Sequence, residues 1–161
     1  IEALTSKLEE MGVKMEIGID TITVEHNDNL LPVDITTKPY PGFATDLQQP
    51  LTALLTQIKG ESRVVDTIYT ERFKHCLELQ RMGADIDIDK GSSIIKGPSK
   101  LYGDKVYATD LRCGACLVIA GLLAEGETEI HDIYHIDRGY YDIDEKIKKL
   151  GGDICREVVE K

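Results

Sequence analysis

The sequence predicts an α/β fold assembled from repeated βαβαββ-type units, because two patterns recur along the chain. The first is a helix with one apolar face, then a Gly-Glu-Ser or Gly-Glu-Thr stop, a β-branched stretch and an arginine, and it occurs twice. The second is a helix that closes on a glycine and leads into an extended stretch, and it occurs three times. The chain therefore contains half a unit followed by two whole units.

The closing helix and strand of a unit appear at residues 4–20 (LTSKLEEMGVKMEIGID), 77–89 (LELQRMGADIDID) and 143–158 (IDEKIKKLGGDICREV). The first copy lacks the opening helix that the other two possess. We therefore expect the N-terminus to lie inside a unit, so that the chain is a fragment with a truncated first unit. The C-terminus is expected to follow a completed strand.

The helix that opens each whole unit has a single apolar face. Its apolar residues fall at the same intervals in both copies: Leu47, Leu51, Leu54, Leu55 and Ile58, then Leu111, Ala115, Val118, Ile119 and Leu122. This spacing predicts two helices that are each buried along one side. Each helix ends at a glycine-containing stop, Gly60-Glu61-Ser62 or Gly126-Glu127-Thr128.

A β-branched stretch follows each opening helix. The two stretches are RVVDTIY (63–69) and TEIHDIY (128–134), and both are predicted as strands that end in Ile-Tyr. Each leads directly into an arginine, Arg72 in the first unit and Arg138 in the second. These arginines should therefore lie at equivalent edges of the fold.

An acidic residue marks the start of each opening helix. Thr45-x-x-Gln48 resembles a capping box, and Thr109 or Asp110 is placed to cap the second helix. Asp46 should lie at the entrance of its helix rather than in the middle. One interpretation is that Asp46 and Asp110 are helix caps and nothing more.

A functional interpretation is also open. Helix N-termini favour anionic ligands, so a carboxylate held there needs a reason, and a general base toward a sugar hydroxyl is one. Arg72, Arg112 and Arg138 stand at matching edges of the units, and arginine is suited to forked recognition of carboxylate and phosphate. Each arginine taken singly is equally compatible with a solvated or ion-paired side chain.

Composition limits the class of protein. The chain has 161 residues, 42% of them hydrophobic and 30% charged, which suits one globular domain or lobe. The net charge of −10 disfavours nonspecific nucleic-acid binding, which needs a broad basic surface. No apolar run reaches about 18 residues, so no membrane span is expected.

The four cysteines are interpreted as free thiols in a reducing cytoplasm. Cys113 and Cys116 form a C-x-x-C pattern, but they fall in a predicted helix without a partner pair or a nearby histidine. Packing residues on one helix explain them better than a redox or zinc site.

Five stretches resemble the C-terminal part of the UDP-N-acetylglucosamine 1-carboxyvinyltransferases, a family of enolpyruvyl transferases: PGFATDLQQPLTALL (41–55), TIYTERFKH (67–75), RMGA (81–84), ATDLR (108–112) and IYHIDRGY (133–140). The resemblance extends over essentially the whole chain. It implies a two-lobe enzyme in which each lobe is an inside-out α/β barrel of three similar units around a shared cleft. Residues 1–161 would be a single lobe, and the partner lobe would precede it in the same polypeptide.

The resemblance also implies a reaction. The enolpyruvyl group of phosphoenolpyruvate is transferred to the 3′-hydroxyl of UDP-N-acetylglucosamine by addition and elimination, with release of phosphate. This is the first committed step of peptidoglycan synthesis, and so it bears on cell-wall formation, cell shape and cell division. No metal or organic cofactor, nucleic acid or membrane is implied, and the expected location is the cytoplasm.

Three residues near the first unit acquire roles from the resemblance. Asp46 matches the aspartate that contacts the sugar hydroxyl and is the favoured base. Ile68 matches a position whose backbone touches the nucleotide sugar, and Arg72 matches an arginine near the phosphate-bearing reactants.

Three further residues match the phosphoenolpyruvate site. Arg112 and Arg138 would hold its carboxylate and phosphate, while Asp110 would either orient an arginine or relay a proton. The proton-donating cysteine of the family belongs to a loop of the first lobe, and none of the four cysteines here matches it. The isolated chain is therefore expected to be inactive.

Two alternatives stay open at this point. The parent protein could be another enolpyruvyl transferase, such as the shikimate 3-phosphate type. It could also be a non-catalytic repeat module that binds a partner through an exposed face of the lobe.

Overall fold

The computed structural model describes residues 1–158, and its first three elements form the predicted half unit. They are α1 (Glu2–Glu10), β1 (Lys14–Ile17) and β2 (Ile22–Glu25). The two strands pair in an antiparallel hairpin that has no third strand among the described residues. The predicted closing helix and strand of residues 4–20 are therefore confirmed.

The middle unit contains all six predicted elements in the predicted order. They are β3 (Ile35–Thr36), α2 (Thr45–Leu55), β4 (Gly60–Val65), α3 (Lys74–Arg81), β5 (Asp85–Asp89) and β6 (Ser92–Gly97). Its four strands form one sheet in the order β3-β4-β6-β5, in which β3 and β4 are parallel and the other pairs are antiparallel. The βαβαββ pattern is confirmed for this unit.

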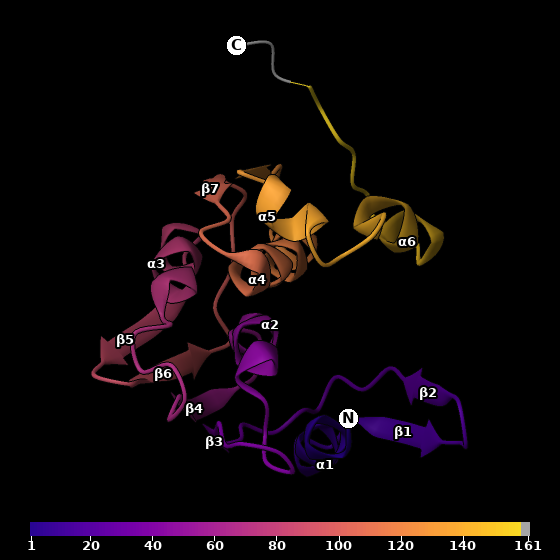
Figure 1. Ribbon diagram of the computed structural model, residues 1–161, viewed down its shortest axis with the longest axis vertical. Helices are drawn as coiled ribbons and strands as arrows, with labels where there is room; N and C mark the ends of the chain where they lie inside the picture. The colour runs from indigo at the N-terminus through magenta and orange to yellow at the C-terminus, as the bar shows by residue number, and fades with distance from the viewer. Residues whose placement is uncertain (159–161) are drawn as a thin grey trace.

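The last unit departs from the prediction. Its elements are β7 (Lys105–Tyr107), α4 (Leu111–Leu123), β8 (Glu129–His131), α5 (Tyr134–Asp137) and α6 (Ile143–Lys149). The strand predicted within 143–158 is wrong, because residues 150–158 form no strand. Instead, the guanidinium of Arg156 holds this segment against α5 and α6 through Asp137 and Asp144. Figure 1 shows the segment leaving α6 and extending beyond the body of the molecule, and it pairs with no strand among the described residues.

The predicted strand ends at Ile-Tyr are also wrong. In the middle unit β4 ends at Val65, because the backbone N–H groups of Ile68 and Tyr69 donate to the carboxylate of Asp66 instead of a neighbouring strand. In the last unit β8 ends at His131, since Asp132 adopts a left-handed backbone with φ of 57° and the chain then turns into α5.

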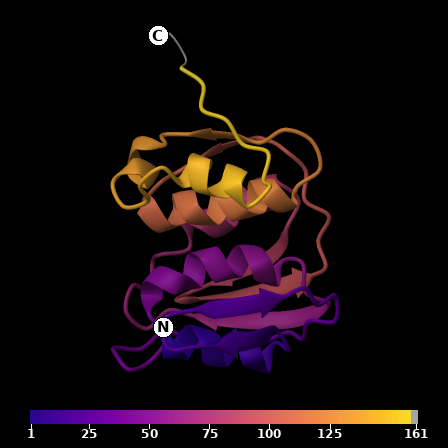
Figure 2. The same cartoon turned by 90° about the vertical axis from the view of Figure 1, so that its right-hand side faces the viewer.

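Helices α2 and α4 form the centre of the molecule, and sheets and further helices cover them. Figure 2 shows α2 lying on the four-stranded sheet and α4 lying next to α2, with α6 beyond. Helices α2 and α4 contact each other, and the hydrophobic core they share contains the buried residues Ala53 and Leu55 of α2 and Cys116 and Leu117 of α4.

The stripe predicted on α2 is confirmed as a core face, since Leu51, Leu55 and Ile58 are buried. The single buried face predicted for α4 is only partly right, because Leu122 is 44% exposed while Cys113, Cys116 and Leu117, outside the predicted stripe, are fully buried.

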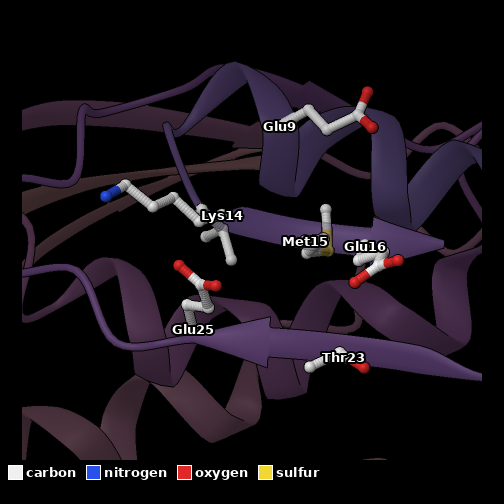
Figure 3. Close-up of a pocket in the computed structure, with 7 residues that line it drawn as sticks. Glu9, Lys14, Met15, Glu16, Thr23 and Glu25 are labelled. Atoms are coloured by element: carbon white, nitrogen blue, oxygen red, sulfur yellow. The ribbon is translucent and has the colours of Figure 1, made fainter.

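The half unit has a surface hollow and a strand pair that is exposed to solvent. A hollow of about 380 Å³ lies between α1 and the hairpin, and its lining includes Glu9, Lys14, Glu16 and Glu25 (Figure 3). None of the candidate site residues lines it. Val24, which pairs with Met15 on the hairpin, is 60% exposed, whereas Ile95 on β6 in the four-stranded sheet is 1% exposed.

Candidate active site at the first turns of α2 and α4

The packing of α2 against α4 brings their N-terminal ends together. Asp46 lies in the first turn of α2, and Arg112 lies in the first turn of α4. Asp110 is the N-cap of α4, where its Oδ1 accepts the backbone N–H groups of Arg112 at 2.8 Å and Cys113 at 3.0 Å. The predicted cap at Asp110 is confirmed, and Asp46 lies at the helix entrance as expected.

Asp46 is held by two arginines from different units. Its Oδ1 accepts from Nη1 of Arg72 at 3.1 Å, and its Oδ2 accepts from Nη2 of Arg112 at 2.9 Å. The Arg112 guanidinium holds the pKa of Asp46 below its ordinary value; partial burial opposes this shift and Arg72 reinforces it. Asp46 is therefore a carboxylate at neutral pH, and it is not a helix cap.

The two arginines have further partners that fix their orientation. Nη1 of Arg112 donates to the hydroxyl of Tyr140 at 2.7 Å, and the guanidinium lies 5.5 Å from the centre of the Tyr140 ring. Arg72 lies 5.5 Å from the ring centre of Tyr69, and its Nη2 is 3.8 Å from Oδ1 of Asp110. Asp46, Arg72, Asp110 and Arg112 therefore form one charged cluster that joins two repeat units.

The predicted capping box at the start of α2 is wrong. Ala44 is the N-cap and makes no side-chain cap bond. The hydroxyl of Thr45 donates instead to Oδ2 of Asp66 at 2.6 Å, and Nε2 of Gln48 donates to the backbone oxygen of Arg72 at 3.2 Å. Two partners that are distant in the sequence, Asp66 and the backbone of Arg72, bind the side chains that the local pattern assigned to the helix end.

Asp66 is the residue that the sequence interpretation missed. It follows β4 directly, is 1% exposed, and accepts hydrogen bonds from Thr37, Thr45, Ile68 and Tyr69. The signal in the sequence was an acidic residue directly after the apolar pair of RVVD, which the strand prediction had treated as part of the ladder.

Ile68 and Arg138 lie outside the charged cluster. The backbone N–H of Ile68 donates to Oδ1 of Asp66 at 2.9 Å, which fixes the loop that leads to Arg72. Arg138 follows α5 directly, is exposed, and forms no ion pair within residues 1–158. It stands two positions before Tyr140, whose hydroxyl contacts Arg112, but Arg138 itself makes no side-chain hydrogen bond to the cluster within residues 1–158.

Cys113 and Cys116 are packing residues, as the sequence suggested, since both are fully buried in the core. Within residues 1–158, no group of three or more histidine, cysteine and acidic side chains is arranged to hold a metal ion. None of the helices described in this range has the length and apolar character needed to cross a membrane.

Residues 1–147 match the family model described as EPSP synthase (3-phosphoshikimate 1-carboxyvinyltransferase). The chain belongs to this family of enolpyruvyl transferases. Its relatives include UDP-N-acetylglucosamine 1-carboxyvinyltransferase 2 of Listeria monocytogenes, which is 57% identical over 156 residues, and the protein of the same name from Staphylococcus aureus, which is 55% identical over 159 residues. The resemblance identified from the sequence motifs is confirmed.

These matches extend over 97% and 99% of this enolpyruvyl transferase chain. The chain spans only 37% and 38% of the lengths of the two relatives. Among solved structures, the enolpyruvyl transferase NikO from Streptomyces tendae superposes with a TM-score of 0.87 at 30% identity, over 94% of this chain and 35% of its own.

An EPSP synthase structure from Acinetobacter baumannii has a TM-score of 0.61 at 21% identity, over 80% of this chain and 31% of its own. At this identity the likeness concerns the fold alone. Together with the NikO structure, it confirms the predicted fold class of the enolpyruvyl transferases.

Proposed function

We propose that this chain belongs to an enzyme that transfers the enolpyruvyl group of phosphoenolpyruvate to the 3′-hydroxyl of UDP-N-acetylglucosamine and releases phosphate. The observation that carries the proposal is the pairing of Asp46 with both Arg72 and Arg112. It places a carboxylate suited to a hydroxyl beside two guanidinium groups suited to an anion. The names of the most similar relatives supply the identity of the substrates.

The first chemical step is an addition. The hydroxyl oxygen of the sugar bonds to C2 of phosphoenolpyruvate, the hydroxyl proton passes to Asp46, and C3 receives a proton from an acid that we place outside this chain. The second step is an elimination, in which C3 loses a proton and phosphate leaves from C2. The chain's own contribution is the base and the positive charge around the anionic reactant.

The pairing of Asp46 also explains how its basicity is controlled. Arg72 and Arg112 each donate to Asp46 in the structure, and these contacts lower its pKa. An anionic reactant competes for the same guanidinium groups, because each can form forked hydrogen bonds with carboxylate or phosphate. When the anion binds, Asp46 loses part of this stabilisation and becomes a stronger base toward the neighbouring hydroxyl.

The other candidate residues complete the proposed site. The backbone at Ile68 contacts the nucleotide sugar, Arg112 and Arg138 hold the carboxylate and phosphate of phosphoenolpyruvate, and Asp110 either orients Arg72 or relays a proton. The 3.8 Å separation between Arg72 and Asp110 supports the orienting role. The side chain of Arg138 is exposed, which leaves it available to an anionic ligand.

The complete site requires more protein than this chain. The relatives are much longer, since 156 matched residues make up 37% of the Listeria protein. We place the described residues in one lobe, with the acid and the remaining contacts in another lobe of the same protein. We place the reaction in the cytoplasm, which fits four free cysteines, and assign it to peptidoglycan synthesis, with its consequences for cell shape and division.

A second candidate is the shikimate 3-phosphate type of enolpyruvyl transferase, which the description of the matching family model favours. The identity figures argue against it, at 57% for the nucleotide-sugar relative and 21% for the EPSP synthase structure. The same anionic cluster would serve either reaction, so the acceptor substrate separates the two.

The deciding experiment measures phosphate release from phosphoenolpyruvate by the full-length protein that contains this chain, with UDP-N-acetylglucosamine and shikimate 3-phosphate offered separately. We expect release only with the nucleotide sugar, and a fall of roughly 10²–10⁴-fold in Asp46→Ala. Asp87→Ala is the matched control, because Asp87 also pairs with a cation, Lys96 at 2.7 Å, but on the surface of β5. Release only with the shikimate compound would replace the substrate, and release with neither would leave a binding module.

A further inference from the structure

We propose that Asp66 is a positioning residue of the enolpyruvyl transfer site, whose buried carboxylate fixes the start of α2, with Asp46, relative to the loop that carries Arg72. This inference deepens the proposed function and rests on it for its kinetic consequences. Its geometric content is independent of the substrate, because it concerns how two parts of this chain are held together.

The Asp66 carboxylate connects three segments that are distant in the sequence. Its Oδ1 accepts from Oγ1 of Thr37 at 2.8 Å and from the backbone N–H groups of Ile68 at 2.9 Å and Tyr69 at 2.8 Å. Its Oδ2 accepts from Oγ1 of Thr45 at 2.6 Å. The residue therefore ties β3, the first turn of α2 and the loop after β4 to one point.

These connections close a ring around the candidate base. Thr45 directly precedes Asp46, and the loop that begins at Ile68 ends at Arg72, which returns to Asp46 at 3.1 Å. Gln48 strengthens the ring, because its Nε2 donates to the backbone oxygen of Arg72 at 3.2 Å and lies 3.5 Å from Oδ2 of Asp66. Moving either Thr45 or the loop would change the Asp46–Arg72 contact.

All the donors to Asp66 are neutral groups. Burial alone would raise the pKa of Asp66, but hydrogen bonds from Thr45, Tyr69, Thr37 and Ile68 keep that pKa below its ordinary value. A buried carboxylate without a cation partner is costly unless its oxygens are well hydrogen-bonded. Here the hydrogen bonds meet that need, and they also impose one arrangement on α2 and the loop.

The last unit of the chain provides an internal comparison with the middle unit. Asp132 occupies the position of Asp66 after β8, but it is exposed and makes no side-chain hydrogen bond within residues 1–158. In that unit Asp110, the counterpart of Asp46, uses Oδ1 to cap its own helix. In the middle unit α2 begins at Thr45, and both carboxylate oxygens of Asp46 bind arginines. Asp46 therefore does not cap its helix in the middle unit, where the buried Asp66 binds Thr45, the residue directly before Asp46.

The test compares Asp66→Asn with Asp132→Asn and Ser62→Ala in the full-length protein. Asparagine replaces one acceptor oxygen with a donor, which opposes the hydroxyl or N–H groups that point at it. Asp132→Asn makes the same change at the equivalent exposed position. Ser62 lies on β4, is buried, and accepts from the backbone N–H of Val33, so Ser62→Ala disturbs the same strand without touching the ring.

We expect Asp66→Asn to reduce kcat by roughly 10- to 100-fold, since small displacements of reacting groups have effects of this size. The acid limb of kcat/KM should also move to higher pH, because Asp46 without Arg72 has a higher pKa. Other titratable groups around this region are Asp110, Arg112, Tyr140 and the buried His75, and none is changed by the substitution. Asp66→Glu keeps both acceptor oxygens, so its acid limb should lie closer to that of the unmodified protein than the acid limb of Asp66→Asn does.

Several outcomes would overturn the proposal. If Asp66→Asn loses thermal stability as Ser62→Ala does, but keeps kcat within about twofold and an unmoved acid limb, Asp66 is only structural. If Asp66→Asn does not fold, Thr45→Val removes one hydroxyl from the ring and should give a smaller shift of the same sign; an unmoved limb in Thr45→Val would equally contradict the proposal.

A crystal structure of Asp66→Asn separates this inference from the proposed function. Loss of the 3.1 Å contact between Arg72 and Asp46 would support the positioning role even if the unmodified protein released phosphate with neither acceptor. Retention of the contact would overturn the positioning role even if the unmodified protein were fully active.

Discussion

Arg112 donates from Nη2 to Oδ2 of Asp46 across 2.9 Å, in a contact that joins residues 66 positions apart in the sequence. The two residues belong to the first turns of α2 and α4, so the packing of two repeated helices creates the contact. The repeat therefore has a structural consequence: one copy contributes the carboxylate of this ion pair and the other contributes the guanidinium.

Removing the charge of Arg112 should change both the pH dependence and the affinity for the anionic reactant. In Arg112→Gln the pKa of Asp46 rises, because Arg112 is the main cause of its lowered value. We expect the acid limb of kcat/KM to move to higher pH. The KM for phosphoenolpyruvate should rise by about tenfold or more, since a hydrogen bond to a charged group contributes about 1.5–3 kcal/mol.

Arg81→Gln is the matched control for this measurement. Arg81 ends α3, is exposed, and has no side-chain contact with Asp46. Its pH profile and its KM should equal those of the unmodified protein. An acid limb that stays in place in Arg112→Gln would mean that a group other than Asp46 controls it.

The pH dependence of stability should reveal His75, which is fully buried in α3. Burial lowers its pKa to about 3, so the folded protein keeps it neutral. An unfolded chain protonates histidine below a pKa of about 6.5. As the pH falls from about 6.5 toward 3, the unfolded state binds the additional proton, and the free energy of unfolding should decrease by about 1.4 kcal/mol per pH unit from this residue.

Urea unfolding at several pH values would measure this contribution. His75→Gln should remove that part of the slope, and His26→Gln should leave it unchanged because the His26 side chain is largely exposed. Equal slopes in all three proteins would show that His75 has a partner or solvent access that keeps its pKa near the ordinary value.

The helices of this fold were predictable because their signal is local. The apolar intervals of 47–58 and 111–122 describe one helix face, and helix faces depend on residues three or four positions apart. The repeat placed Asp46 and Asp110 at equivalent helix starts, and the family resemblance, not the repeat, assigned them with Arg112 to one cleft.

The role of Asp66 could not be derived in this way, because its partners come from three segments. Thr45 and Gln48 match a capping box locally, yet a buried carboxylate 21 positions from Thr45 binds its hydroxyl. The strand predicted within residues 143–158 was wrong for a similar reason. An alternating pattern forms a strand only where another strand edge is available to pair with it.

The reactivity of the four thiols should follow their burial. Burial raises the pKa of Cys76 to about 12 and also raises the pKa of Cys113 and Cys116, while Cys155 is exposed. We expect an alkylating reagent to label Cys155 in the native protein and the other three only after unfolding. Peptide mass spectrometry distinguishes the four positions, and early labelling of Cys113 or Cys116 would contradict the packing of α4 described above.

Two glycines of α4 should respond oppositely to the same substitution. A Cβ at Gly121 would meet Thr128 Cβ at 3.4 Å, which is an ordinary contact, so Gly121→Ala should stabilise the helix by up to about 1 kcal/mol. A Cβ at Gly114 would overlap Cγ1 of Ile136, a buried residue of α5. Overpacking of this kind costs about 1–3 kcal/mol, so Gly114→Ala should destabilise the protein.

Gly114→Ala should affect catalysis as well, because Ile136 lies two residues before Arg138 and four before Tyr140. If α5 moves away from α4 to admit the methyl group, the Tyr140 hydroxyl loses its 2.7 Å contact with Arg112, and the KM for phosphoenolpyruvate should rise. Thermal unfolding and steady-state kinetics of the two variants measure both effects. If both alanines stabilise the protein and neither changes KM, then the methyl group at Gly114 is admitted without displacing α5, and close packing at Gly114 does not determine where Arg138 stands.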